Sequence, residues 1–186
     1  MRYLVVGLGN IGEQYVASPH NIGFAILDHF VAKHQTSFAD VHLGSMALIK
    51  HRGQEVHLLK PATYMNLSGH AVYYWMNKLM CKKVQLLIIT DDLHLPLGKL
   101  RIKPKGGDGG HNGLKHIAHM LQTQVYPRLR FGVGDNCLPH GKKEYVITPL
   151  APSQQTLIAP AIITSSDIIT GFYTKGLAFV MNRYNT

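Results

Sequence analysis

Short apolar runs alternate along this chain with segments of helical periodicity, and this alternation limits its possible folds more than any other feature. Residues 3–6 are apolar, partly β-branched and followed by Gly7, which is the pattern of a strand buried on both faces. Residues 84–89 form the most hydrophobic run and are predicted to be a central strand. The other predicted strands are a hairpin of residues 46–49 and 56–59, an edge strand at 100–103, a strand at 128–133 and a short strand at 145–147.

Apolar residues at helical spacing predict helices between these strands. The first begins at Ser18 and Pro19, an N-cap residue followed by proline at the first helical position. The others are expected at residues 68–79, at 114–121 and over a long segment of low charge at about 153–183.

No linker, internal repeat or low-complexity tract divides the chain. We therefore predict one α/β domain over residues 1–186, with a mixed, mostly parallel sheet sandwiched by helices and a C-terminal helix. In such sheets ligands bind outside the carboxyl ends of the parallel strands. The candidate site segments are therefore residues 7–20, 90–98 and 104–113.

The charge balance indicates a polyanionic partner. Lysine and arginine number 19 against 10 acidic residues, which gives a net charge of +9 with all 12 histidines neutral. Such an excess on one small domain favours a nucleic acid or an anionic membrane as partner, although a basic surface that only promotes solubility has the same composition. No apolar run approaches the roughly 20 residues needed to span a bilayer, and the N-terminus lacks the layout of a signal peptide. With only Cys81 and Cys137, neither a disulfide framework nor a thiolate metal site is expected, so we predict a soluble cytoplasmic protein.

Residues 7–12 match the dinucleotide-binding pattern G-x-G-x-x-G, but the context of the match is wrong. That pattern needs a helix that begins at its glycines, so that the first amides of the helix face a pyrophosphate. Here the predicted helix begins only near Pro19, and no acidic residue ends a second strand at the required spacing. We expect instead a tight turn that presents Asn10.

His20 and Asp91 are candidates for acid–base chemistry. His20 lies at the start of a predicted helix, where the helix dipole favours the neutral imidazole that a general base needs. A solvated surface histidine is the alternative. Asp91 and Asp92 directly follow the most hydrophobic strand, where one of them could orient a histidine.

A metal site is another interpretation of the same residues. Carboxylate oxygens and imidazole nitrogens can bind divalent metals, and the available ligands are Asp91, Asp92, His94, His20 and His111. Their spacing is irregular, however, and it does not include the H-E-x-x-H pattern.

Two further segments have an order that periodicity does not explain. Residues 60–69 include Asn66, whose amide can both donate to and accept from a peptide group. Residues 101–115 contain four glycines around Asp108, followed by His-Asn-Gly at a predicted helix start. The backbone of this loop can approach a ligand closely, and its flanking cations fit phosphate contacts. It lacks the G-K-[ST] ending of a P-loop.

Taken together, these segments closely resemble the bacterial-type peptidyl-tRNA hydrolases. The matching blocks are G-L-G-N-x-G at 7–12, Tyr15, H-N at 20–21, K-P-x-T-Y-M-N-x-S-G at 60–69, D-D-L-x-L-P-x-G at 91–98 and G-G-x-G-G-H-N-G-L-K at 106–115. The resemblance covers residues 1 to about 134, and the chain length and the helical tail agree with it.

This resemblance implies an enzyme that hydrolyses the ester between a peptide and the 3′ end of tRNA, with no metal or other cofactor. The family's catalytic histidine falls on His20, the acid that orients it on Asp91, and a site asparagine on Asn10. Its substrate-binding residues fall on Tyr15, Met65, Asn66, His111 and Asn112. Its contacts to tRNA phosphates fall on Lys103 and Arg130, with Lys105 a further candidate by position. We expect a cytoplasmic monomer that binds the acceptor end of peptidyl-tRNA, without a membrane or an obligate protein partner.

Four positions depart from the family pattern. Ile11 replaces a proline, which removes one constraint on its loop, and Pro19 replaces an arginine, which removes a cation beside His20. His94 replaces the third aspartate of D-D-L-D, so any role of that acid is absent here. Asp135 stands where a basic residue or proline is common, which weakens the tRNA contacts expected there.

The expected mechanism is general base catalysis, in which Asp91 holds His20 in one tautomer while the imidazole takes a proton from the attacking water. Asn10 is a candidate donor to the oxyanion or to that water, and Asn66 and Asn112 are expected to bind the peptide main chain. Two other classes of protein remain open: a non-catalytic RNA-binding protein with the same basic surface, and a metal-dependent phosphoesterase.

Overall fold

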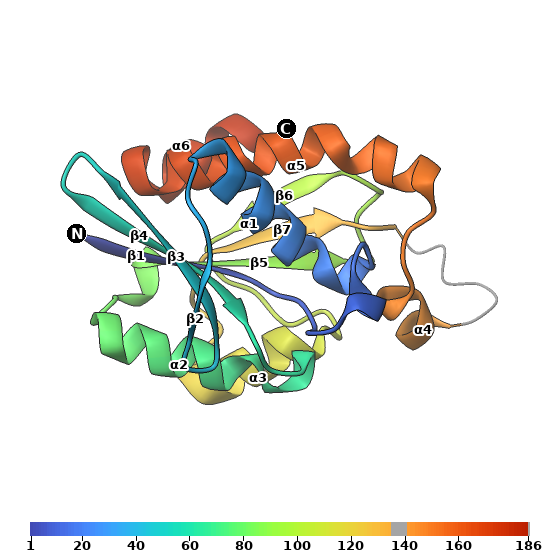
Figure 1. The fold of residues 1–186 in the computed structure, drawn as a ribbon, viewed down its shortest axis with the longest axis horizontal. Coiled ribbons are helices and arrows are strands. Elements are labelled where there is room, and N and C mark those ends of the chain that lie inside the picture. The colour runs from blue at the N-terminus through green and yellow to red at the C-terminus, as the bar shows by residue number, and fades with distance from the viewer. Residues whose placement is uncertain (135–140, 186) are drawn as a thin grey trace.

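The computed structural model describes residues 1–134 and 141–185, and its centre is one seven-stranded sheet (Figure 1). The strand order is β2-β3-β4-β1-β5-β7-β6. The strands are β1 (Arg2–Gly7), β2 (Ala39–Val41), β3 (Gly44–His51), β4 (Gln54–Pro61), β5 (Leu86–Asp92), β6 (Leu100–Lys103) and β7 (Arg128–Gly132). The central strands β4, β1, β5 and β7 pair in parallel, whereas the edge strands pair antiparallel. The predicted mixed α/β sheet is therefore confirmed.

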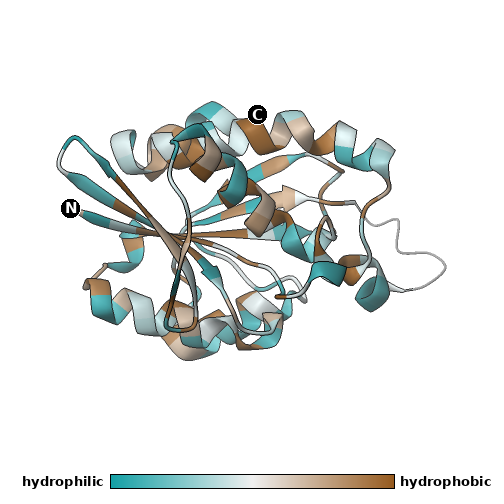
Figure 2. Ribbon diagram, viewed as in Figure 1, coloured by the Kyte–Doolittle hydropathy of each residue, from teal (hydrophilic) through white to brown (hydrophobic). Residues whose placement is uncertain are grey.

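Helices cover both faces of the sheet, as Figure 1 shows. One face carries α1 (Ile22–Lys33), α5 (Pro152–Lys175) and α6 (Leu177–Tyr184), and the other carries α2 (Ser68–Leu79) and α3 (Asn112–Leu121). Because successive strand residues point to opposite faces, Val5 and Leu87 enter the first core while Leu4 and Leu86 enter the second. Apolar residues accordingly concentrate along the central strands (Figure 2).

Most of the predicted elements are found, with shifts at their ends. The hairpin of β3 and β4, the edge position of β6 and the bounds of α2 agree with the prediction. The central strand β5 begins only at Leu86, because a 3-10 turn (Lys83–Gln85) precedes it and leaves Val84 exposed. The first α-helix follows a 3-10 turn (Pro19–Asn21) rather than the fingerprint glycines, so the predicted start of this helix near Pro19 is confirmed.

The short strand predicted at residues 145–147 is wrong, because this segment belongs to α4 (Lys142–Ile147). Its β-branched residues do not pair with a strand of the sheet. Instead, Val146 is buried, and the Tyr145 hydroxyl donates a hydrogen bond of 2.6 Å to the Val133 carbonyl oxygen. Packing thus overrides the local β propensity. The predicted C-terminal helix is also divided in two, since Gly176 takes a positive φ of 89° between α5 and α6.

The helix α5 is long and apolar enough, by length and composition, to cross a membrane. The expectation that no segment reaches this threshold therefore fails for α5. In the structure α5 buries Ile168, Ile169 and Phe172 in the core shared with α1 and the sheet. These contacts are those of a core helix in a globular domain. Of the remaining sequence predictions, those on Asp135 and Cys137 lie outside the described residues.

Candidate active site

The site residues come from segments that follow the carboxyl ends of adjacent parallel strands. Asn10 follows β1, Met65 follows β4, and Asp91 and Asp92 end β5. His111, the N-cap residue of α3, completes this sheet end. These residues therefore lie together at the carboxyl ends of the parallel strands, which is where the sequence predicted the site.

Two glycines allow the segment that carries His20 to approach the sheet. A Cβ atom on Gly7 would lie 2.3 Å from the Gly23 carbonyl oxygen, and one on Gly23 would lie 2.4 Å from the Leu8 nitrogen. The end of β1 and the first turn of α1 are thus in backbone contact. Any side chain at either position would push away the turn that places His20 beside β5.

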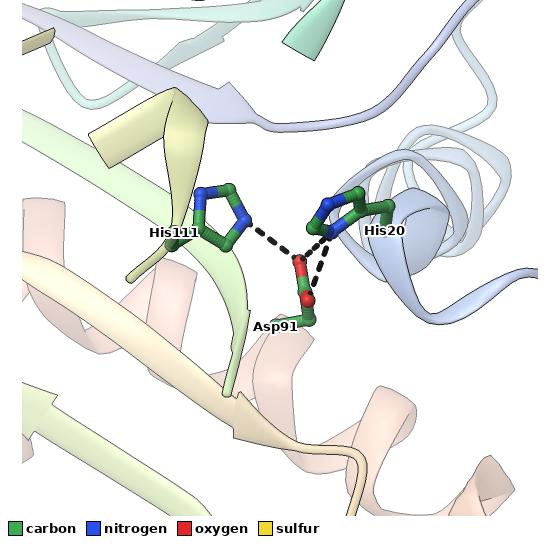
Figure 3. A group of neighbouring side chains, drawn as sticks. All are labelled: His20, Asp91 and His111. Carbon is green, nitrogen blue, oxygen red and sulfur yellow. Dashed lines mark hydrogen bonds and ion pairs between the residues drawn. The ribbon is translucent and has the colours of Figure 1, made fainter. Parts of the chain in front are cut away.

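His20, Asp91 and His111 form one hydrogen-bonded cluster, drawn in Figure 3. The Nδ1 atom of His20 lies 3.0 Å and 2.9 Å from Oδ1 and Oδ2 of Asp91, and the Nε2 atom of His111 lies 2.9 Å from Oδ1. The two rings lie 4.9 Å apart at an angle of 59°. The Asp91 side chain is 2% exposed and that of His20 is 12% exposed, so the cluster is closed toward the protein and open at His20.

The hydrogen-bond partners determine which nitrogens carry protons. The Nδ1 atom of His111 accepts from the backbone N–H groups of Gly113 and Leu114, at 3.1 Å and 3.3 Å, so its proton lies on Nε2 and is donated to Asp91. Because the Asp91 carboxylate only accepts, His20 must also present a proton on Nδ1. The Nε2 atom of His20 is then left with a free lone pair and makes no hydrogen bond to the described residues.

Asp91 is held in its charged form. Its burial alone would raise the pKa of the carboxyl group, but the adjacent His111 and His20 outweigh burial and hold the pKa well below its usual range. The carboxylate therefore stays an acceptor for both histidines at neutral pH.

The cluster has the composition of a metal site but not the proton arrangement of one. The nearest ligand atoms of His20, Asp91 and His111 lie within 4.8 Å of one another. A metal on Nε2 of His111 would require the lone pair of that nitrogen, and hence a proton on Nδ1. That proton would face the two backbone N–H groups that cap α3. The His111 donor therefore does not fit a metal ion.

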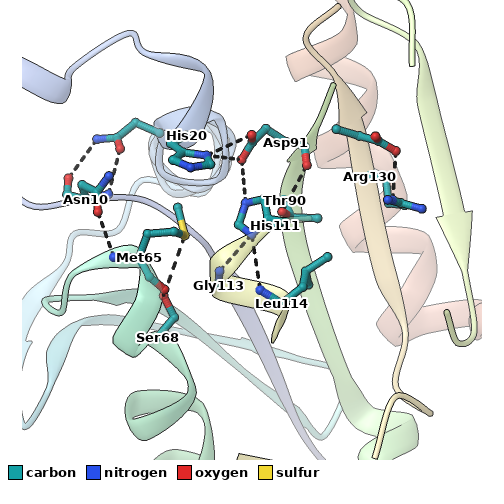
Figure 4. Close-up of polar contacts among 12 residues, drawn as sticks. Asn10, His20, Met65, Ser68, Thr90, Asp91, His111, Gly113, Leu114 and Arg130 are labelled. Carbon is teal, nitrogen blue, oxygen red and sulfur yellow. Dashed lines mark hydrogen bonds and ion pairs between the residues drawn. The ribbon is translucent and has the colours of Figure 1, made fainter. Parts of the chain in front are cut away.

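Asn10 is fixed on the other side of His20, as Figure 4 shows. Its Oδ1 atom accepts from the Met65 backbone N–H at 2.9 Å, and its backbone is bonded twice to the Asn21 side chain, at 2.8 Å and 3.0 Å. Met65 is buried beside it and its turn is held by the Ser68 hydroxyl, which donates to the Met65 carbonyl oxygen. With Oδ1 bonded to the Met65 N–H, the Nδ2 hydrogens are the donors that the Asn10 side chain can offer to a ligand.

A pocket of about 160 Å³ opens beside the cluster. We call it the His20 pocket, and it is lined by His20, the end of β5, residues 108–112, Arg130 and the first turn of α4. Of the predicted substrate-binding residues, His111 and Asn112 line this pocket. Tyr15 is half-buried in the turn after the Asn10 loop, and Asn66 is exposed next to Met65.

The three predicted phosphate contacts are separated by the structure. Arg130 lines the His20 pocket, whereas Lys103 and Lys105 are exposed and lie outside it. Lys103 pairs with Arg128 in the register of the antiparallel strands β6 and β7, and Arg101 pairs with Arg130, so these basic residues share one face of this strand pair. Arg101 was not predicted as a site residue, although alternation along an edge strand was a signal that could have indicated it.

The sequence did not reveal two contacts in this region. His111, which the resemblance predicts to bind substrate, also donates to Asp91 and caps α3. Asp92 is a second buried carboxylate, whose Oδ2 atom lies 2.9 Å from Nε of Arg130 and whose Oδ1 atom accepts from the His94 backbone N–H at 2.9 Å. Sequence spacing carries no signal for either contact, since each joins different elements or a turn that only the fold defines.

Known proteins share both the sequence and the fold. The family model described as peptidyl-tRNA hydrolase matches residues 4–186. Peptidyl-tRNA hydrolases of Phocaeicola vulgatus and Parabacteroides distasonis are 46% and 44% identical over 185 residues, which span 100% of this chain and 99% of each relative. The crystal structure of peptidyl-tRNA hydrolase from Acinetobacter baumannii superimposes with a TM-score of 0.90 at 30% identity, covering 99% of this chain and 94% of that one.

Proposed function

Because the chain belongs to the peptidyl-tRNA hydrolase family and hydrolyses peptidyl-tRNA, we propose that His20 is the general base of this reaction. The observation that carries the proposal is the bond from Nδ1 of His20 to Asp91, at 2.9 Å, in a pocket that leaves Nε2 free to react. A histidine in this state can take a proton from water at neutral pH.

The reaction runs in two steps. Water attacks the ester carbonyl carbon while Nε2 of His20 takes its proton, which forms a tetrahedral intermediate and an imidazolium whose charge Asp91 stabilises. The carbon–oxygen bond to O3′ of the terminal ribose then breaks, and Nε2 returns the proton to the leaving oxygen. The products are a peptide with a free carboxylate and a tRNA with a free 3′ end.

Asn10 is the proposed donor to the oxyanion. Its Oδ1 atom is used by the Met65 N–H group, so the remaining Nδ2 hydrogens suit the negative oxygen that develops on the carbonyl. This choice favours the oxyanion over the attacking water, which needs an acceptor for its proton.

His111 is a positioning residue in this proposal. It donates to the same Asp91 oxygen that faces His20, and the cap of α3 fixes its own ring. Met65, Asn66, Asn112 and Tyr15 are proposed to bind the peptide part, with the two asparagine amides paired to the peptide N–H and C=O groups. The tRNA phosphates are proposed to contact Lys103, Lys105 and Arg130. We expect the enzyme to act in the cytoplasm as a monomer on the acceptor end of the tRNA, without a cofactor.

Hydrolysis of N-acetyl-aminoacyl-tRNA, followed by release of the acylated amino acid, tests the proposed site. The wild type should act on this substrate and should spare aminoacyl-tRNA with a free amine, because the amides of Asn66 and Asn112, once the bound substrate covers them, would be left unpaired when the substrate amide is missing. Such mispairing costs up to about 10⁴-fold in rate. Equal rates on both substrates would contradict the roles of Asn66 and Asn112. Full activity after treatment with EDTA is expected, and its loss would contradict a site without metal.

A further inference from the structure

A second polar cluster lies in the His20 pocket, beside the cluster of His20, Asp91 and His111. It consists of Asp92, His94 and Arg130, and the Asp92 side chain is only 4% exposed while that of His94 is 61% exposed. The cluster contains the histidine that replaces an aspartate of the family pattern. The proposed mechanism uses none of its three side chains for chemistry.

Asp92 acts as an anchor for the other two residues. Its Oδ1 atom accepts from the His94 backbone N–H at 2.9 Å and lies 3.3 Å from Nδ1 of the His94 ring, and its Oδ2 atom lies 2.9 Å from Nε of Arg130. Both contacts use the inner nitrogen of each side chain. Nε2 of His94 and the two terminal nitrogens of Arg130 are thereby left as the groups that face away from Asp92.

The glycine loop and α4 line the same pocket as this cluster. Gly109 has a φ of +60°, and a Cβ atom there would lie 2.7 Å from Nη2 of Arg130 and 3.9 Å from the His94 ring. The loop backbone therefore runs directly over Arg130, as only glycine permits. Lys142 and Lys143, both exposed, line the same pocket from the first turn of α4.

The acidic groups of the pocket are already engaged. Asp91 binds its two histidines, Asp92 binds Arg130 and His94, and Oδ1 of Asp108 accepts from the Gly110 N–H at 2.8 Å. Among the described residues, the polar groups at this side of the pocket that point away from these carboxylates belong to Arg130, His94 and the two lysines. Their shared chemistry is the binding of an oxyanion.

We infer that His94 and Arg130 bind a phosphodiester of the substrate within the His20 pocket, and that this phosphate is the one on the 3′-terminal nucleotide. The inference rests on the proposed role of His20, which fixes where the ester lies. The reacting ester is on O3′ of the terminal ribose and the phosphate is on O5′ of the same ribose, so the two groups are separated by a single sugar. The pocket brings His20 and the His94–Arg130 pair into one cavity that matches this arrangement. To donate to the phosphate, His94 carries a proton on each nitrogen, with Nδ1 held by Asp92 and Nε2 on the phosphate.

Two minimal substrates that differ only in this phosphate test the inference. Both are adenosine with an N-acetyl-aminoacyl group on the 3′ oxygen, and one also carries a 5′-(methyl phosphate), which has the single charge of an RNA linkage. The wild type should have a kcat/KM roughly tenfold higher for the phosphate-bearing substrate, the lower end expected of one charge-assisted hydrogen bond, and the difference should be in KM.

Variants of His94 assign the preference to this residue. His94→Asp, which installs the acid of the family pattern, and His94→Gln should lower the preference for the phosphate-bearing substrate to about twofold or less, and His94→Arg should retain it. Because His94 is largely exposed, all three variants are expected to fold. The matched control is His119→Asp, the same charge change at an exposed histidine on α3 that does not line the pocket.

Three results would overturn the inference: no preference in the wild type, a full preference in His94→Asp, or an equal loss in His119→Asp. The phosphate-free substrate separates this failure from failure of the proposed function. If the wild type hydrolyses that substrate and His20→Ala does not, the role of His20 stands whatever the phosphate preference is.

Discussion

Asp91 and Asp92 are consecutive and both buried, yet they organise two different kinds of chemistry. Asp91 is on the side of β5 that carries Leu87 and Ile89, and it collects two histidines as N–H donors. Asp92 is on the opposite side, and it collects the permanent cation of Arg130 together with His94. The alternation of side chains along a strand thus separates the proposed proton-transfer cluster from the proposed phosphate-binding cluster within two residues.

The difference between the two carboxylates lies in the charge of their partners. The two imidazoles beside Asp91 donate N–H groups to its carboxylate, which can stabilise the imidazolium that forms on His20 during the reaction. A guanidinium beside Asp92 neutralises that carboxylate, so the pair presents N–H donors to an anion without excess negative charge. We therefore expect changes at Asp91 to alter kcat and changes at Asp92 to alter KM.

The largest effect should come from His20→Ala. Removal of a general base lowers kcat by about 10²–10⁴-fold, while substrate binding is largely kept. Single-turnover rates on N-acetyl-aminoacyl-tRNA measure this effect separately from binding. More than about a tenth of wild-type turnover in the variant would contradict a role in general base catalysis.

The comparison between the carboxylates is sharpest in the pair Asp91→Asn and Asp92→Asn. In the present structure both histidines donate an N–H group to Asp91. An asparagine at position 91 can accept only through its oxygen, and its NH2 group faces one of the two histidines as a second donor. His20 is then no longer held in the tautomer with the proton on Nδ1, and kcat should fall about 10²-fold or more. The same change at position 92 leaves His20 untouched, and it should raise KM several-fold with kcat nearly constant. Steady-state kinetics of the two variants, with circular dichroism to check folding, measure both parameters. If kcat fell equally in Asp91→Asn and Asp92→Asn, the proposal that the two clusters have different functions would be wrong.

An intermediate effect is expected at His111, which both caps α3 and donates to Asp91. His111→Ala removes both contacts and should lower stability by about 1 kcal/mol as well as kcat. His111→Asn restores the cap, because asparagine is a good N-cap residue, but it is too short to reach Asp91. We expect His111→Asn to have near wild-type thermal stability and a kcat lowered about tenfold.

The outcome of this pair separates positioning from folding. If kcat recovers together with stability in His111→Asn, then His111 acts only through the helix cap. If stability recovers alone, the bond to Asp91 is what His20 requires. His119→Asn, at an exposed position near the end of the same helix, controls for the substitution itself.

The sequence predicted the elements of the fold and most of the site because local patterns determine them. Buried strands such as β5 are marked by continuous apolar runs, and the site segments follow the ends of parallel strands. The strand predicted at residues 145–147 failed because its β propensity was not matched by a free sheet edge, and Val146 packs instead as part of a helix.

The hydrogen bond of His111 to Asp91 and the ion pair of Arg130 with Asp92 could not be predicted, because each depends on where two separate elements meet. His111 joins the start of α3 to the end of β5, and Arg130 joins β7 to β5. No periodicity or spacing determines such a meeting point. The resemblance to the family located His111 near the substrate, but it did not give the direction in which its proton points.

The smallest effect is expected at Lys103, which lies outside the His20 pocket on the exposed face of β6. Each phosphate contact releases condensed counterions, so the affinity for tRNA should fall with salt with a log–log slope of about −0.7 to −0.9 per contact.

Lys103→Met keeps most of the apolar stem and removes only the charge. It should raise KM a few-fold and flatten the salt slope by roughly one unit or less, with kcat unchanged. The same variant should leave hydrolysis of the phosphate-bearing adenosine substrate unaltered, unlike the changes at His94 and Asp92. Lys50→Met, on the exposed side of β3 toward the far edge of the sheet, is the matched control and should leave the slope as it is. If Lys103→Met lowers turnover on the minimal substrate as much as on whole tRNA, Lys103 belongs to the pocket and the separation between near and distant phosphate contacts fails.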